Sequence, residues 1–142
     1  MSLASVVLDT NVIVAALPSR RGTSARVLYL VGRGLVEVNV SVPVVLEYEA
    51  VLKRPGTVPA YTPAALDELI DGLCAVARLR PVDFRWRPQL TDPSDEAVLE
   101  LAVAAGGAPI VTWNVRHFRG AERFGVAVRT PPELLHDIGA LP

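Results

Sequence analysis

Two hydrophobic patterns alternate along the chain. Short apolar runs such as Val-Val-Leu at 6–8 are typical of strands buried on both faces of a parallel sheet, although so short a run is also compatible with a buried helix. Longer stretches, whose apolar residues recur every three or four positions, are typical of amphipathic helices. Strands are predicted at 6–8, 35–40, 78–82, 108–112 and 126–128, and helices at 12–17, 24–32, 42–54, 63–76, 95–105 and 131–138. This order favours a three-layer α/β/α sandwich with a mainly parallel sheet.

Polar residues at the starts of the predicted helices support these boundaries. Ser24, Ser41, Thr62 and Ser94 stand where an N-cap side chain would accept a hydrogen bond from the first helical turn. Thr-Pro-Pro-Glu at 130–133 has the spacing of a capping box. A long polar loop is predicted at 83–93. With no internal repeat or linker, residues 1–142 are predicted to form one domain.

The composition narrows the class of protein. With 51% hydrophobic and 20% charged residues, the chain has a globular composition, and no apolar run approaches the roughly 18 residues of a membrane span. No secretory signal is recognisable, and the single Cys74 cannot form an internal disulfide, so a cytoplasmic location is expected. Cys74 is expected to be a small buried hydrophobe. The net charge of −1 gives no overall electrostatic reason for nucleic-acid binding.

Several acidic residues have simple structural interpretations. Glu49 precedes Lys53 by four positions, the spacing of a surface ion pair on a helix. Glu96 and Glu100 are spaced to share a solvent-facing side of one helix. Asp92, directly before a proline, is typical of a turn. These acids are set aside as candidates for chemistry.

Three acids lack such a partner: Asp9, Glu47 and Asp95. Each also has a simpler interpretation. Asp9 or Asn11 fits the position of an N-cap, Glu47 that of a partly exposed flanking residue, and Asp95 that of a first-turn acid stabilised by the helix dipole. However, each follows a strand or begins a helix that follows one. In a parallel sheet all three are therefore expected to meet at the same edge.

Carboxylates brought together repel one another unless a cation joins them, and a cluster of oxygen ligands suits Mg²⁺ or Mn²⁺. Such an ion stabilises charge on a phosphate and activates water, so the constellation predicts phosphodiester hydrolysis. The sequence contains no Cys/His set with zinc spacing, no Gly-rich phosphate loop and no Ser-His-Asp arrangement that would favour another chemistry.

Five segments resemble one known family. They are Val-Leu-Asp-Thr-Asn-Val at 7–12, Val-Val-Leu-Glu-Tyr at 44–48, Asp-Pro-Ser-Asp-Glu-Ala-Val-Leu at 92–99, Ile-Val-Thr-Trp-Asn at 110–114 and Thr-Pro-Pro-Glu-Leu-Leu at 130–135. In order and spacing they resemble the PIN-domain family of metal-dependent ribonucleases, specifically the toxins of VapBC-type toxin–antitoxin systems. The resemblance implies a small α/β/α domain, a carboxylate site for Mg²⁺ or Mn²⁺, an RNA substrate, a homodimer and inhibition by a small cognate antitoxin.

The resemblance also assigns roles to particular residues. It matches Asp9, Glu47 and Asp95 to the family's first three acids, and these are expected to be catalytic and to bind the metal. The supporting polar positions, expected to contact substrate or water, are Thr10, Asn11 and Thr112. Where many members carry a fourth acid, this chain has Asn114, which is expected to orient water or ligands without adding charge. The resemblance leaves open whether one metal or two bind.

Basic and aromatic residues near these segments are candidates for RNA contact. Five arginines fall on predicted loops that would rim the same edge of the sheet: Arg20, Arg21, Arg116, Arg119 and Arg123. Among these, Arg116 is expected to bind the substrate. Trp113 is a candidate stacking platform for a base, and His117 a candidate group to act on the leaving group. Each also has a structural interpretation as a solvated residue or, for Trp113, a core aromatic.

Three hypotheses follow. The leading one is a metal-dependent endoribonuclease, a toxin of a type II pair. The alternative is a PIN-like module that binds RNA or protein without catalysis, motivated by Asn114. A dehalogenase-type phosphatase with Asp9 as nucleophile is disfavoured, because Asn11 stands where that chemistry needs a second acid.

Overall fold

Five parallel strands form the centre of the protein. The structure, a computed structural model, describes residues 4–82, 90 and 92–140. The strands are β1 (Ala4–Leu8), β2 (Val36–Val40), β3 (Arg78–Leu79), β4 (Ile110–Val111) and β5 (Val128–Arg129). They pair in the order β3-β2-β1-β4-β5, and every pair is parallel. The predicted parallel sheet is confirmed, with β1 in the middle.

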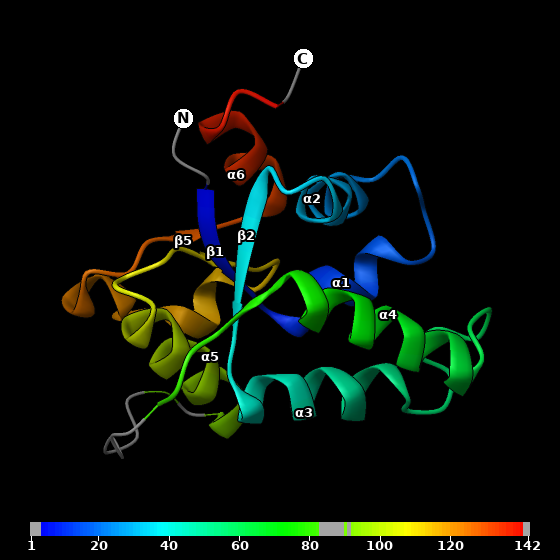
Figure 1. Ribbon diagram of the computed structural model, residues 1–142. Coiled ribbons are helices and arrows are strands. Elements are labelled where there is room, and N and C mark those ends of the chain that lie inside the picture. The colour runs from blue at the N-terminus through cyan, green and yellow to red at the C-terminus, as the bar shows by residue number, and fades with distance from the viewer. Residues whose placement is uncertain (1–3, 83–89, 91, 141–142) are drawn as a thin grey trace.

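Helices cover both faces of this sheet. They are α1 (Thr10–Ala16), α2 (Thr23–Gly32), α3 (Val42–Leu52), α4 (Pro63–Val76), α5 (Pro93–Ala104) and α6 (Pro131–Asp137), with short 3-10 helices η1 (Val115–Phe118) and η2 (Ala121–Phe124). Helix α5 packs against β1, β2 and β4, whereas α2 and α4 pack against β2. In Figure 1, α5 lies on one side of the strands and α1, α2 and α4 lie on the other. The predicted α/β/α architecture is therefore confirmed.

The position of β1 explains its continuous apolar run. Val6, Val7 and Leu8 are each no more than 1% exposed, because helices cover both faces and strands flank both edges. Leu8 is in register with Val111 of β4, and the next backbone N–H, that of Asp9, donates to the Val111 carbonyl at 2.9 Å. The carboxyl ends of β1 and β4 are therefore aligned at one edge of the sheet.

Three of the predicted helix caps are confirmed. The Ser41 hydroxyl accepts from the Val44 N–H at 3.4 Å, and the Thr62 hydroxyl accepts from the Ala65 N–H at 3.1 Å. Thr130 and Glu133 form both hydrogen bonds of a capping box at the start of α6. These local side-chain bonds fix where α3, α4 and α6 begin.

Two other predicted caps are wrong. Helix α5 is capped by Asp92, whose Oδ1 accepts from the Ser94 N–H at 2.7 Å, so Ser94 lies inside the helix. The reason is Pro93, which needs no hydrogen-bond partner in a first turn and lets the helix begin earlier. Ser24 lies in the first turn of α2, and its buried hydroxyl accepts from the Trp113 indole N–H at 2.9 Å.

Three burial predictions are also wrong. Helix α4 buries Leu66 and Ile70, but its last turn leaves the free Cys74 exposed, so Cys74 is not a core residue. Glu96 is only 8% exposed, and its carboxylate accepts from the Leu90 N–H at 2.8 Å. The 3- and 4-residue spacing of apolar residues in the helix predicted at 63–76 puts Val76 on the same buried face as Leu66 and Ile70, but Val76 is 54% exposed.

Strand β3 is shorter than predicted, and β5 begins at Val128 rather than at 126. The loop expected at 83–93 lies almost entirely outside the described residues. In the part of the chain that is described, no helix is both long enough and apolar enough to cross a membrane.

Candidate active site

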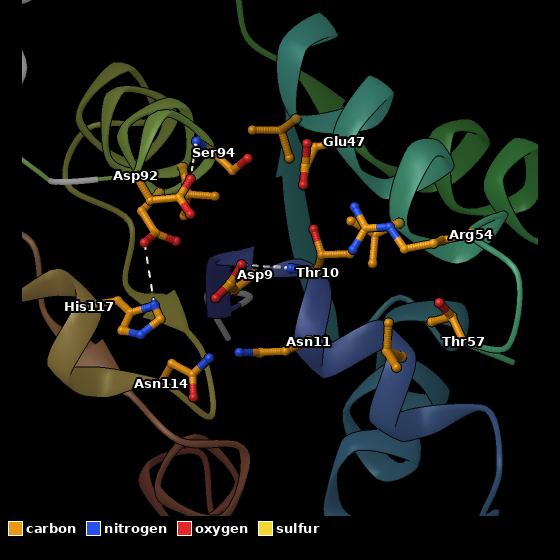
Figure 2. A pocket seen from close by; sticks show the side chains of 15 residues that line it. Asp9, Thr10, Asn11, Glu47, Arg54, Thr57, Asp92, Ser94, Asn114 and His117 are labelled. Carbon is orange, nitrogen blue, oxygen red and sulfur yellow. Dashed lines mark hydrogen bonds and ion pairs between the residues drawn. The ribbon is translucent and has the colours of Figure 1, made fainter.

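A cavity of about 520 Å³ opens at the carboxyl end of the sheet. The three candidate acids line it from three different segments: Asp9 directly after β1, Glu47 on α3 and Asp95 in the first turn of α5. Asn114 and His117 line it from the segment after β4 (Figure 2). The sheet therefore brings together the residues that the sequence singled out.

Asp9 has two roles in this geometry. One carboxylate oxygen accepts from the Thr10 backbone N–H at 2.8 Å, which makes Asp9 the N-cap of α1. The other oxygen accepts from the Thr112 hydroxyl at 2.8 Å. The N-cap interpretation of Asp9 is therefore correct, but it does not remove the side chain from the cavity, which Asp9 also lines.

Thr112 is the centre of a buried hydrogen-bond network beneath the cavity. Its side chain is fully buried, and besides donating to Asp9 its hydroxyl accepts from the Asn11 amide at 3.3 Å and the Asn114 backbone N–H at 2.9 Å. The side-chain oxygen of Asn11 (Oδ1) in turn accepts from the Trp113 backbone N–H at 3.2 Å. The network ties the segment after β4 to the end of β1, and so fixes Asp9 relative to Asn114.

Tyr48 provides a second connection between elements of the site. Its side chain is fully buried, and its hydroxyl donates to the Leu8 carbonyl at 2.5 Å. Tyr48 follows Glu47 on α3, and Leu8 precedes Asp9 at the end of β1. This hydrogen bond therefore holds the two segments that carry Glu47 and Asp9 in a fixed relation.

The negative charges of the acids that line the cavity repel one another. Burial raises the pKa of the Asp9 carboxyl, with a further contribution from Glu47, while the hydrogen bonds from Thr112 and Thr10 oppose the rise. Burial, together with the charges of Asp9 and Asp92, raises the pKa of the Asp95 carboxyl to about 6. The carboxylates thus carry negative charge that the described part of the protein balances only in part.

His117 is the one basic side chain that pairs with an acid of this cluster within the described residues. Its Nδ1 lies 3.4 Å from an Asp95 carboxylate oxygen, and its side chain is more than half exposed. No described lysine or arginine forms an ion pair with Asp9, Glu47 or Asp95. A cation bound in the cavity would therefore relieve the repulsion among the acids.

The donor chemistry fits a hard divalent ion. The acids offer carboxylate oxygens, the preferred protein ligands of Mg²⁺ and Mn²⁺, and the cavity is large enough for water ligands. Among the described residues, no three acidic, histidine or cysteine side chains form a set that holds an ion by itself. Mg²⁺ is commonly held by only one or two carboxylates and retains several waters, so this spacing remains compatible with it.

Sequence reasoning missed four polar residues that line the cavity: Arg54, Thr57, Asp92 and Ser94. A signal was available for Arg54, which lies seven positions after Glu47. Seven residues are close to two helical turns, so a helix that continued to Arg54 would carry both side chains on the same side. The helix ends at Leu52, but the chain continues far enough to bring Arg54 over the cavity.

The arginines and the tryptophan that were candidates for RNA contact lie outside the cavity. Arg116 and the other predicted rim arginines (Arg20, Arg21, Arg119 and Arg123) are exposed and do not line the cavity. An RNA contact by Arg116 therefore stays a prediction. Trp113 is 43% exposed, with its indole held by Ser24, so it is neither a core residue nor part of the cavity lining.

Comparison with known proteins identifies the family to which the chain belongs. Residues 5–116 match the family described as PIN domain, and the chain belongs to that family. PIN domains are generally nucleases and typically use a divalent metal.

The fold is also similar to that of a solved structure, a chain of VapBC2 from Rickettsia felis bound to a DNA fragment from the promoter. The TM-score is 0.56 at 18% sequence identity, over 89% of this chain and 98% of the other. No curated protein matches the sequence significantly.

Proposed function

We propose that this protein is an endoribonuclease that hydrolyses RNA phosphodiester bonds with the help of a divalent metal ion. The observation that carries the proposal is the meeting of Asp9, Glu47 and Asp95, from three separate segments, around one cavity of a PIN domain. The raised pKa values of Asp9 and Asp95 support a cation as their partner.

Asp9, Glu47 and Asp95 would hold Mg²⁺ or Mn²⁺. When bound, such an ion stabilises the charge that develops on the phosphate and lowers the pKa of water. The chain itself orients the ligands: the Thr112 hydroxyl and the Thr10 N–H each fix one oxygen of the Asp9 carboxylate. Ligands held in this way keep their geometry without reorganisation during the reaction.

The segment after β4 supplies the uncharged polar groups of the proposed mechanism. The Asn114 side chain faces the cavity, where its amide can orient the attacking water, and its backbone is fixed by Thr112. Asn11 faces the cavity from α1 and would contact the phosphate or its water. His117, beside Asp95, is placed to donate a proton to the leaving oxygen.

The biological role that we propose is that of a toxin in a type II toxin–antitoxin pair. The support is the similarity in fold to a chain of VapBC2, together with the PIN-domain membership. A small cognate antitoxin and a homodimeric state belong to this proposal. Induced expression of the wild-type chain in bacteria should arrest growth, and Glu47→Gln should not. Equal growth of cells that express either chain at equal levels would contradict the toxin role.

A second candidate is a PIN-domain module that binds RNA or protein without cleaving it. Two observations favour it: Asn114 stands in place of a fourth acid, and the described residues contain no self-sufficient set of three ligands. The two candidates differ in whether the acids bind a divalent ion.

Thermal unfolding with Mn²⁺ separates them. At about ten times its Kd, Mn²⁺ should stabilise the native chain by about 1.4 kcal/mol and raise Tm by roughly 4 °C. Asp95→Asn should lose most of this rise. Asp71→Asn, which removes an exposed acid of α4 outside the cavity, should keep it. An unchanged Tm in millimolar Mn²⁺, with RNA still bound, would favour the non-catalytic module.

A further inference from the structure

The turn that follows α3 presents two side chains to the cavity. The Arg54 carbonyl accepts from the Thr57 N–H at 3.2 Å, with Pro55 and Gly56 at the two central positions. Gly56 has φ +82°, and proline followed by such a glycine is typical of a type II turn. Both central residues therefore suit this turn without strain. Arg54 and Thr57, at its two ends, both line the cavity.

Arg54 carries the only positive charge of an arginine or lysine among the described residues that line the cavity. Four acids share that lining, yet the Arg54 guanidinium forms no ion pair with any described residue. The preceding residue, Lys53, is by contrast bonded to both Glu49 and Asp67. Arg54 is therefore not the counter-charge of the acids, and its donors remain available to a ligand.

The chemistry of the turn matches a phosphate. A guanidinium offers paired N–H donors that fit two phosphate oxygens, and a threonine hydroxyl adds one more donor. A strand of RNA entering a cavity lined by four acids is repelled, so a cationic contact is needed along its path. In Figure 2, Arg54 and Thr57 stand on one side of Asp9, and Asn114 and His117 on the other.

We propose that the Arg54–Thr57 turn binds a backbone phosphate of the RNA strand adjacent to the phosphate that is cleaved. The inference rests on the proposed ribonuclease function and assigns to it a substrate-positioning site. Arg54 supplies the charge and the paired donors, and Thr57 supplies the hydroxyl. The acids act on the scissile phosphate, while the turn sets how the strand lies across them.

Binding of a fluorescent single-stranded oligoribonucleotide tests this without cleavage. The test is made in the Asp9→Asn chain with Mg²⁺, where adding Arg54→Gln should weaken RNA binding about tenfold. The logarithm of the association constant should also fall less steeply with the logarithm of the salt concentration, its slope being smaller in magnitude by about 0.7, the value for one lost phosphate contact. The matched control is Arg33→Gln, an exposed arginine at the end of α2 outside the cavity, which should change neither. Equal effects of the two substitutions, or an unchanged slope for Arg54→Gln, would overturn the inference.

Two further variants separate charge from geometry. Arg54→Lys keeps the charge but loses the paired donors, so it should recover only part of the affinity. Thr57→Val should weaken binding about threefold with the salt slope unchanged, because only a neutral donor is lost. Full affinity in Thr57→Val would remove that residue from the site. Because the Arg54 guanidinium forms no ion pair within the described chain, its substitution should leave Tm unchanged, and a lower Tm would mean a structural role instead.

Kinetics in the otherwise wild-type chain complete the test. Arg54→Gln should raise KM about tenfold and leave kcat within about twofold, as expected for a contact equally strong before and during the reaction. A fall in kcat alone would place Arg54 on the reacting phosphate and overturn the assignment. If the wild-type chain binds RNA through Arg54 but never cleaves it, only the ribonuclease proposal fails. If it cleaves RNA and Arg54→Gln behaves as wild type, only this inference fails.

Discussion

Replacement of Asp9 by Asn should abolish RNA cleavage and leave the fold intact. Asn is as good an N-cap as Asp, so the start of α1 should persist. The substitution removes one negative charge from the proposed metal site and one of the two oxygens that Thr10 and Thr112 now fix. We expect the cleavage rate in saturating Mn²⁺ to fall by about 10³-fold or more, measured with a 5′-labelled RNA.

The control for this prediction is Asp71→Asn, the same chemical change at an exposed position of α4, which should cleave at the wild-type rate. The Tm of Asp9→Asn should stay equal to that of wild type or rise. Burial disfavours the charged Asp9 carboxylate and raises its pKa, and the substitution replaces this carboxylate with a neutral amide. An Asp9→Asn chain that is folded and still cleaves RNA would exclude Asp9 from the chemistry.

Thr112→Val should have the second largest effect. Valine has the shape of threonine but leaves one Asp9 oxygen and the Asn114 N–H without the hydroxyl that they now share. Loss of a group that orients a metal ligand typically costs 10- to 100-fold in metal affinity or activity. We therefore expect the rate of RNA cleavage to fall roughly 10- to 100-fold. The free energy of unfolding, measured in urea, should fall by about 1–3 kcal/mol, because buried polar groups lose a hydrogen-bond partner.

Thr112→Ser is the matched control, because it keeps the hydroxyl and removes only a methyl group. It should retain most of the cleavage activity and metal affinity while losing about 1 kcal/mol of stability. If Ser and Val at this position reduce cleavage equally, the hydroxyl does not support Asp9, and Thr112 serves only to fill the core.

Local signals were sufficient to predict most of the fold. The run Val6 to Leu8 is apolar at every position because β1 is covered on both faces. Ser41, Thr62 and Thr130 mark helix starts through bonds to residues three positions away, so these boundaries could be read directly. At α5 the helix begins at Pro93, earlier than predicted, so Asp92 rather than the predicted Ser94 is the cap.

The acids of the candidate site were predictable for a topological reason. In a parallel sheet every strand ends at the same edge, so Asp9, Glu47 and Asp95 meet there even though they are far apart in sequence. The burial of Glu96 was not predictable, because helical spacing shows which side of α5 it occupies but not that Leu90 contacts that side. The seven-residue spacing of Arg54 from Glu47 was a partial signal only, because Arg54 lies beyond the end of α3 and its position depends on the turn that follows.

The rate of RNA cleavage before and after metal removal tests the central claim most directly. The chain is treated with EDTA, dialysed, and assayed on single-stranded and structured RNA with and without added Mg²⁺ or Mn²⁺. The proposed function predicts no cleavage in EDTA, recovery on addition of either or both ions, and no recovery for Asp9→Asn. Cleavage at the same rate in EDTA, or equal recovery by Asp9→Asn, would contradict a metal-dependent ribonuclease centred on these acids.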